Sequence, residues 1–166
     1  MPGTPDPALG SDLLTRAVAL LAAVAIVSLS FVLDRKSPRR LAVGGGVAYA
    51  GFCLACWLGA RLLTGMFTSA LVESPGMGSL LVLGALVVLG AQAAVPLYAY
   101  RRYGTVAPLA GLALATGIVV YAFLRVNGET DPLGLYTLFF GPMTVVALTL
   151  LAGVELGGRR LYRSVA

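Results

Sequence analysis

Residues 79–99 read SLLVLGALVVLGAQAAVPLYA, a stretch of 21 residues without a single charge. Because a helix rises about 1.5 Å per residue, this stretch is long enough to cross a hydrocarbon core of about 30 Å. Further apolar runs of similar length occupy residues 13–33, 41–60, 106–124 and 133–154. The sequence therefore predicts an all-α, polytopic integral membrane protein, a bundle of five transmembrane helices in the cell membrane.

The composition supports a single membrane domain. The mean hydropathy is +0.90 and 11% of residues are charged, against about a quarter in soluble domains. A chain of 166 residues with five spans has no room for a second domain. Residues 1–11, rich in proline and glycine, are predicted to be a disordered lead. Residues 61–78 contain an apolar piece too short to span, which fits either an interfacial or a re-entrant segment.

The basic residues predict the orientation. Nine of the 12 Lys and Arg residues lie in the 34–40 loop, at Arg101–Arg102 and in the C-terminal tail. With five spans, all three of these segments fall on one side of the membrane, and Arg16, Arg61 and Arg125 fall on the other. Since cytoplasmic loops carry the excess of Lys and Arg, the N-terminus is expected outside and the C-terminus in the cytoplasm.

Several function classes are disfavoured by composition. The chain has no histidine, which removes the commonest haem and metal ligand and the usual proton relay, so no cofactor is predicted. The formal charge of +5 flanks the apolar runs, so the predicted partner is the lipid bilayer and not nucleic acid. Lys36 is the only lysine in a chain rich in Ala, Gly, Val and Arg, a bias typical of GC-rich, prokaryotic genomes.

The sharpest motif is Cys53-Leu54-Ala55-Cys56, because residues three apart share a helix face. Such a pair in the outer half of a membrane helix resembles the quinone-coupled disulfide-forming enzymes, the group that includes vitamin K epoxide reductase. The resemblance implies a thiol-redox site at Cys53 and Cys56. That chemistry needs a second dithiol, and the chain has no other cysteine, so a partner would have to supply it. The favoured interpretation is that both cysteines are small apolar packing residues.

Gln92 and Pro96 form a second candidate site, for substrate or for packing. A buried amide in lipid needs a partner, which it usually finds on a neighbouring helix. Pro96 lacks the donor that would bond the carbonyl of Gln92, so the two residues could make a polar notch. The favoured interpretation is an interhelical hydrogen bond that sets packing.

Small and polar residues make a stripe on the fifth apolar run at helical spacing, and this stripe is the third candidate site, for substrate or for packing. It comprises Thr137, Gly141, Thr144, Ala152 and Glu155. Gly141-Pro142 is expected to kink the helix, and the stripe is expected to pack against the second helix. Glu155 is expected to pair with Arg159, and Gly157-Gly158 to end the helix.

The second helix is expected in the bundle centre, because its many small residues, Gly45 and Gly51 among them, permit close packing. Taken together, these features favour a small membrane protein without its own catalysis, a subunit or accessory of a membrane assembly. The alternatives are a small oligomeric transporter or channel unit, associating with itself, and a thiol-redox membrane enzyme.

Overall fold

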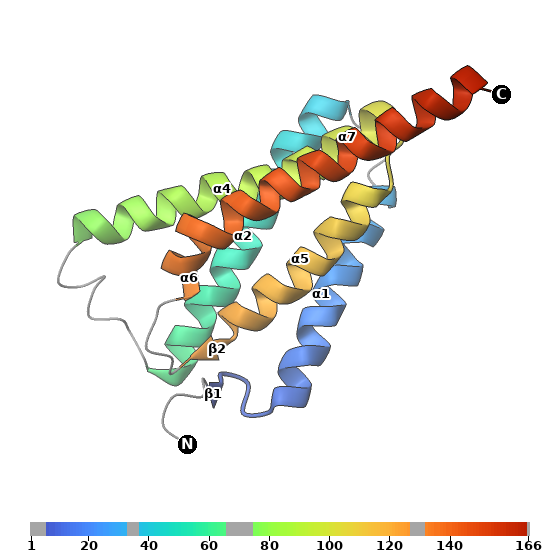
Figure 1. Ribbon diagram of the computed structural model, residues 1–166. Coiled ribbons are helices and arrows are strands. Elements are labelled where there is room, and N and C mark those ends of the chain that lie inside the picture. The colour runs from blue at the N-terminus through green and yellow to red at the C-terminus, as the bar shows by residue number, and fades with distance from the viewer. Residues whose placement is uncertain (1–5, 33–36, 66–74, 127–131, 166) are drawn as a thin grey trace.

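The computed structural model describes residues 6–32, 37–65, 75–126 and 132–165. Its helices are α1 (Asp12–Val32), α2 (Pro38–Thr64), α4 (Pro75–Tyr103), α5 (Ala107–Phe123), α6 (Pro132–Leu135), the π-helical turn η1 (Tyr136–Phe140) and α7 (Gly141–Val165). The strands are β1 (Asp6–Pro7) and β2 (Arg125–Val126). The helices pack into one bundle, in which α4 and α7 are tilted relative to α1 and α2, and the all-α prediction is confirmed (Figure 1). The apolar piece within residues 61–78, residues 66–72, lies outside the described residues.

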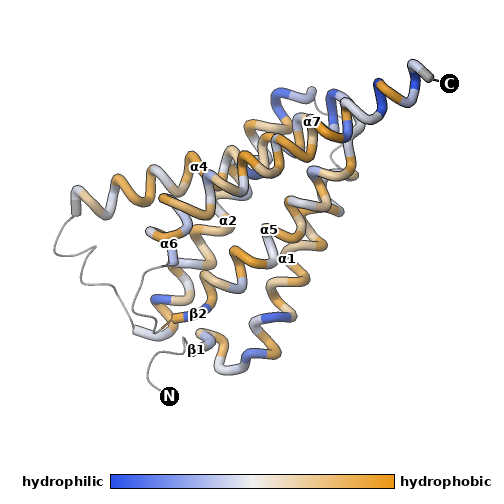
Figure 2. Tube along the Cα trace, viewed as in Figure 1, coloured by the Kyte–Doolittle hydropathy of each residue, from blue (hydrophilic) through white to orange (hydrophobic). Residues whose placement is uncertain are grey.

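Three helical segments in the described part of the chain are long and apolar enough to cross a membrane: Pro38–Thr64, Gly76–Tyr103 and Pro132–Ser164. Helix α5 is also apolar but has 17 residues. Hydrophobic residues dominate the trace, and the most hydrophilic ones gather toward the helix ends (Figure 2). These properties are compatible with a membrane protein.

Helix α5 packs against α1, α2, α4 and α7, so α5 rather than α2 occupies the centre of the bundle. The closest approach of α2 is to α4, where a Cβ added at Gly46 would lie 2.7 Å from the carbonyl oxygen of Gly90. A Cβ at Gly45 would lie 2.5 Å from a methyl carbon of Leu97. Gly51 has no atom within 4 Å of its added Cβ, so the expectation of a close contact there is wrong. Gly51 lies on the outer face of α2.

Residues 6–9 of the lead contact the end of the bundle. The strand β1 pairs antiparallel with β2, and the amide of Ala8 donates to the carbonyl of Leu124 at 2.9 Å. Ala8 and Leu9 also pack against the cluster of buried residues that includes Val120 and Val126. Backbone pairing and this small apolar contact together hold residues 6–9 against the bundle. Residues 1–5 lie outside the described residues.

A π-helical turn, η1, lies directly before Gly141-Pro142, where the sequence predicts a kink. Pro142 has no N–H to donate, and the Gly141 amide donates to the carbonyl of Tyr136, five residues back. The resulting π-helical turn changes the direction in which the preceding side chains point.

Gly157-Gly158 does not end this segment, contrary to expectation, because α7 continues to Val165. Arg159 pairs with Glu155 one turn earlier, so the ion pair spans the two glycines, and its guanidinium donates to the carbonyl of Gly104 at 3.0 Å. These contacts offset the low helix propensity of glycine. The end of α7 projects beyond the other helices (Figure 1).

Candidate functional site

A hydrogen-bond network of polar side chains lies inside the bundle, centred on Gln92 of α4. Gln92 is fully buried, and Tyr49 of α2 and Thr116 of α5 are at most 2% exposed. The Nε2 atom of Gln92 donates to the Tyr49 hydroxyl at 3.0 Å, and the Tyr136 hydroxyl donates to Oε1 of Gln92. The prediction that Gln92 finds partners on neighbouring helices is thus confirmed.

One arrangement of the hydroxyl protons satisfies each contact of this network. The Thr116 hydroxyl donates its single proton to the carbonyl of Leu112 at 2.7 Å. The 3.2 Å contact between Thr116 and Tyr49 therefore has the Tyr49 hydroxyl as its donor. The chain of donors runs from Tyr136 to Gln92, Tyr49, Thr116 and finally a backbone carbonyl. Each of these side chains uses the next one as its partner, which joins four helical segments.

Local backbone features position the network. The π-helical turn directly precedes Gly141, where an added Cβ would collide with a methyl group of Val88 of α4, so the absence of a side chain lets Val88 pack against Gly141 beside Tyr136. The contact between Gly46 and Gly90 likewise brings α2 and α4 together near Tyr49 and Gln92. Pro96 is buried one turn after Gln92, inside α4.

Only some residues of the stripe of small and polar residues on η1 and α7 make contacts inside the bundle. Thr137 is buried, with its Cγ2 methyl 3.0 Å from a Cβ built at Gly84, and its hydroxyl donates to the carbonyl of Leu133. The Thr144 hydroxyl donates to the carbonyl of Phe140 at 2.7 Å, and its side chain also interacts with Tyr136. Pro142 is exposed.

The partners of that stripe differ from the expected one. Helix α7 packs against α4 and α5, whereas the sequence predicts packing against α2. The reason is the order of the bundle, in which α4 lies between α2 and α7.

The two cysteines belong to different parts of the interior. Cys53 is fully buried in the cluster that contains Tyr49 and Leu89, while Cys56 is half-buried and packs against the cluster around Ala60 and Val120. Both thiols are free. Within the described residues, no group of three or more His, Cys, Asp or Glu side chains is placed to hold a metal ion.

Charged residues at the β1–β2 end of the bundle are held by ion pairs, hydrogen bonds and a cation–π contact. Asp12 accepts from Arg16 at 2.7 Å, from Arg125 at 3.4 Å and from the Tyr121 hydroxyl at 3.0 Å. Arg61 is 3% exposed, lies 4.3 Å from the ring centre of Trp57 and donates to the Trp57 carbonyl. This arrangement fixes the side chains that close one end of the bundle.

The opposite end is held by the carboxylate of Glu155. It accepts from the amides of Val106 at 3.1 Å and Ala107 at 2.8 Å, the first amides of α5, and pairs with Arg159 at 2.5 Å. The predicted pairing of Glu155 with Arg159 is confirmed. The carboxylate does more than the sequence predicts, because it also caps α5 from another helix.

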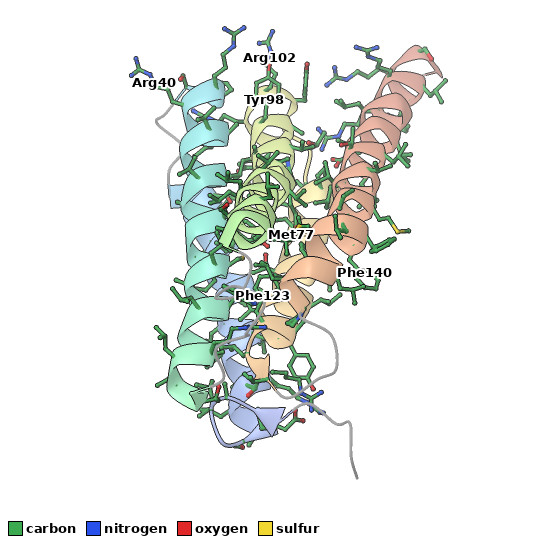
Figure 3. The ribbon with its side chains drawn as sticks, turned by 90° about the vertical axis from the view of Figure 1, so that its left-hand side faces the viewer. Arg40, Met77, Tyr98, Arg102, Phe123 and Phe140 are labelled. Carbon is green, nitrogen blue, oxygen red and sulfur yellow. The ribbon has the colours of Figure 1, made fainter. Side chains whose placement is uncertain are left out.

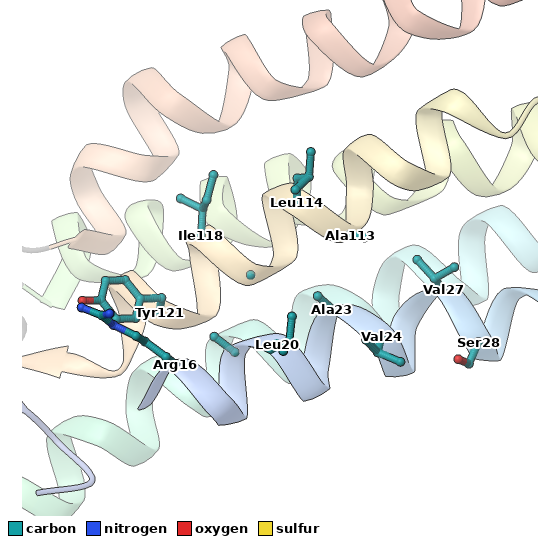
Figure 4. A pocket seen from close by; sticks show the side chains of 12 residues that line it. Arg16, Leu20, Ala23, Val24, Val27, Ser28, Ala113, Leu114, Ile118 and Tyr121 are labelled. Carbon is teal, nitrogen blue, oxygen red and sulfur yellow. The ribbon is translucent and has the colours of Figure 1, made fainter. Parts of the chain in front are cut away.

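Two apolar concavities open on the surface. The α1–α5 groove has a volume of about 740 Å³ and runs from Arg16 and Tyr121 along Ala19, Ala23, Ala113 and Gly117 (Figure 4). The α1–α2–α4 pocket has a volume of about 440 Å³ and runs from Arg40 along Gly44 and Ala48 to Phe52.

Tyr49, Thr116 and Tyr136 are network residues that the sequence analysis missed. A hydroxyl in the middle of an apolar run is the signal they share, since each one needs a buried partner just as Gln92 does. No family model, curated protein or solved structure matches this chain.

Proposed function

We propose that this protein crosses the cell membrane five times, with its N-terminus outside, and serves as a non-catalytic subunit or accessory of a membrane assembly. Helices α1 and α5 have 21 and 17 residues, which at about 1.5 Å per residue gives roughly 31 and 26 Å. Both lengths suit a hydrocarbon core of about 30 Å with modest local adjustment. Large apolar side chains such as Leu20 and Leu114 are more than 60% exposed, as lipid-facing or partner-facing residues would be.

The distribution of arginine supports the proposed orientation. Arg40 and Arg102 lie at the same end of the bundle, with Tyr98 just below that end (Figure 3). The end of α7, which carries Arg159, Arg160 and Arg163, extends in the same direction (Figure 1). An excess of Arg at one end, with tyrosine at the boundary, is the pattern expected on the cytoplasmic side.

The observation that carries the subunit role is the contrast between interior and surface. The interior hydroxyl and amide groups bond to one another across α2, α4, α5 and η1, an arrangement that holds helices together. The α1–α5 groove, in contrast, is open and lined by small residues at i, i+4 spacing, Ala19 with Ala23 and Ala113 with Gly117. Small residues at this spacing let another helix approach closely. We therefore assign the groove to a single transmembrane helix of a partner.

A photo-cross-linking experiment tests this role. A photoreactive residue at Leu114, 72% exposed beside the groove, should yield a discrete cross-linked protein in cells. The same residue at Val47, 66% exposed on α2, is the control and should yield none. Gly117→Leu, whose Cβ meets nothing within 4 Å, should fill the groove and abolish the product, while Gly153→Leu should not. Equal products from Leu114 and Val47 would refute the assignment.

Cysteine labelling tests the orientation independently. In a background without Cys53 and Cys56, cysteine at Ser164 should be protected from an impermeant reagent in intact cells, and cysteine at Thr4 should react. Labelling of both positions from the same side would require an even number of spans.

A further inference from the structure

We infer that the α1–α2–α4 pocket binds one acyl chain of an anionic phospholipid, with the lipid phosphate at Arg40. The inference rests on the proposed membrane insertion and adds a ligand at a site distinct from the α1–α5 groove. It is drawn from the length of the pocket, its apolar walls and the charge at its mouth.

The shape of the pocket suits a single chain from one leaflet. Along α2 it extends from Arg40 to Phe52, which corresponds to roughly 18 Å at 1.5 Å per residue. One leaflet contributes about half of a core of about 30 Å, so the two lengths agree. The volume of about 440 Å³ falls in the range of ligand sites. Ala93 and Leu97 of α4 and Ile26 of α1 supply apolar walls.

The polar groups of the pocket are already bonded away from its mouth. The Ser30 hydroxyl donates to the carbonyl of Ile26 at 2.9 Å, and the Tyr49 hydroxyl belongs to the buried network. An acyl chain can therefore lie along these walls without leaving a polar group unpaired.

Charge at the mouth selects an anionic headgroup. Arg40 is exposed, and no carboxylate among the described residues pairs with it, whereas Arg16 and Arg125 share Asp12 and Arg159 pairs with Glu155. Arg39 adds a second exposed positive charge next to it. The N-terminus of α2, capped by Ser37, points the positive end of the helix dipole toward the same place. A phosphate there meets a cation that no carboxylate of the described residues compensates.

Two glycines of α2 make a matched pair for the test. A Cβ at Gly44 or at Gly51 meets no atom within 4 Å, so both tolerate a larger side chain, but only Gly44 lines the pocket. Native mass spectrometry of the purified protein with added phosphatidylglycerol measures bound lipid. The parent and Gly51→Leu should retain one phosphatidylglycerol, and Gly44→Leu should lose it by at least tenfold. If the melting temperature of Gly44→Leu is lower than that of the parent, Ala48→Leu, which fills the same pocket, replaces it in the test.

Charge variants test the headgroup. Arg40→Gln should lower the preference for phosphatidylglycerol over phosphatidylcholine about fivefold, as expected for one surface arginine. Arg163→Gln, the same charge change on the tail of α7, should leave the preference unchanged. Binding of both lipids equally by the parent, undiminished binding by both pocket variants, or equally tight binding of inorganic phosphate would overturn the inference. Loss of membrane insertion in the labelling experiment would instead refute the proposed function.

Discussion

Replacing Gln92 by leucine tests whether the buried network stabilises the bundle. The substitution keeps a similar volume but removes the acceptor of Tyr136 and the donor to Tyr49. Tyr49 still donates to Thr116, so the main cost is the unpaired Tyr136 hydroxyl. A buried unpaired donor costs about 1–3 kcal/mol. Because the Thr144 side chain also interacts with Tyr136, we expect the lower part of that range, about 1–2 kcal/mol.

A second substitution, at Tyr136, tests whether the two side chains act together. Tyr136→Phe removes the hydroxyl that Gln92→Leu leaves unpaired. Removing both partners of a hydrogen bond is nearly neutral compared with removing one. The double variant should therefore be more stable than Gln92→Leu alone, by about 1 kcal/mol, the size expected for residues in direct contact. Tyr98→Phe, outside the network, controls for the loss of a tyrosine hydroxyl.

The assay is reversible unfolding in mixed micelles, which gives the free energy of unfolding of the parent and each variant. The predicted order of stability is parent and Tyr98→Phe first, then the double variant, then Gln92→Leu. Additive losses in the double variant, or a Gln92→Leu variant as stable as the parent, would refute the view that these side chains act as one network.

Three further predictions follow from the packing. Gly46→Leu should lower the melting temperature strongly, because its Cβ alone would lie 2.7 Å from the Gly90 carbonyl oxygen, whereas Gly51→Leu should change stability by no more than about 0.5 kcal/mol. The Cys53→Ala/Cys56→Ser variant should accumulate and melt within about 1–2 kcal/mol of the parent, and alkylation of the denatured parent should count two free thiols; a quinone-dependent disulfide would contradict this. Glu155→Ala should cost about 0.5–2 kcal/mol by uncapping α5, with Glu155→Gln losing less because one acceptor oxygen remains.

The sequence alone was sufficient for the helical class and for much of the local structure. Apolar run length, together with proline and glycine punctuation, depends on residues close together in the chain, so the helix ends agree with prediction to within a few residues, except that the last helix continues to Val165. The pairing of Glu155 with Arg159 and the irregular turn before Pro142 are also local effects. The need of Gln92 for a partner was evident as well, because a buried amide is costly wherever it lies.

Only the tertiary structure decided which helices meet. Uniformly apolar helices carry little information about their neighbours, so the sequence placed α2 at the centre of the bundle and α7 against it. In the structure α5 is central, and α4 separates α2 from α7. The same uncertainty hid the roles of Tyr49, Thr116 and Tyr136, which form a network only once three other helical segments bring them to Gln92. It also hid the difference between Gly46 and Gly51, since a small residue matters only where another backbone lies against it.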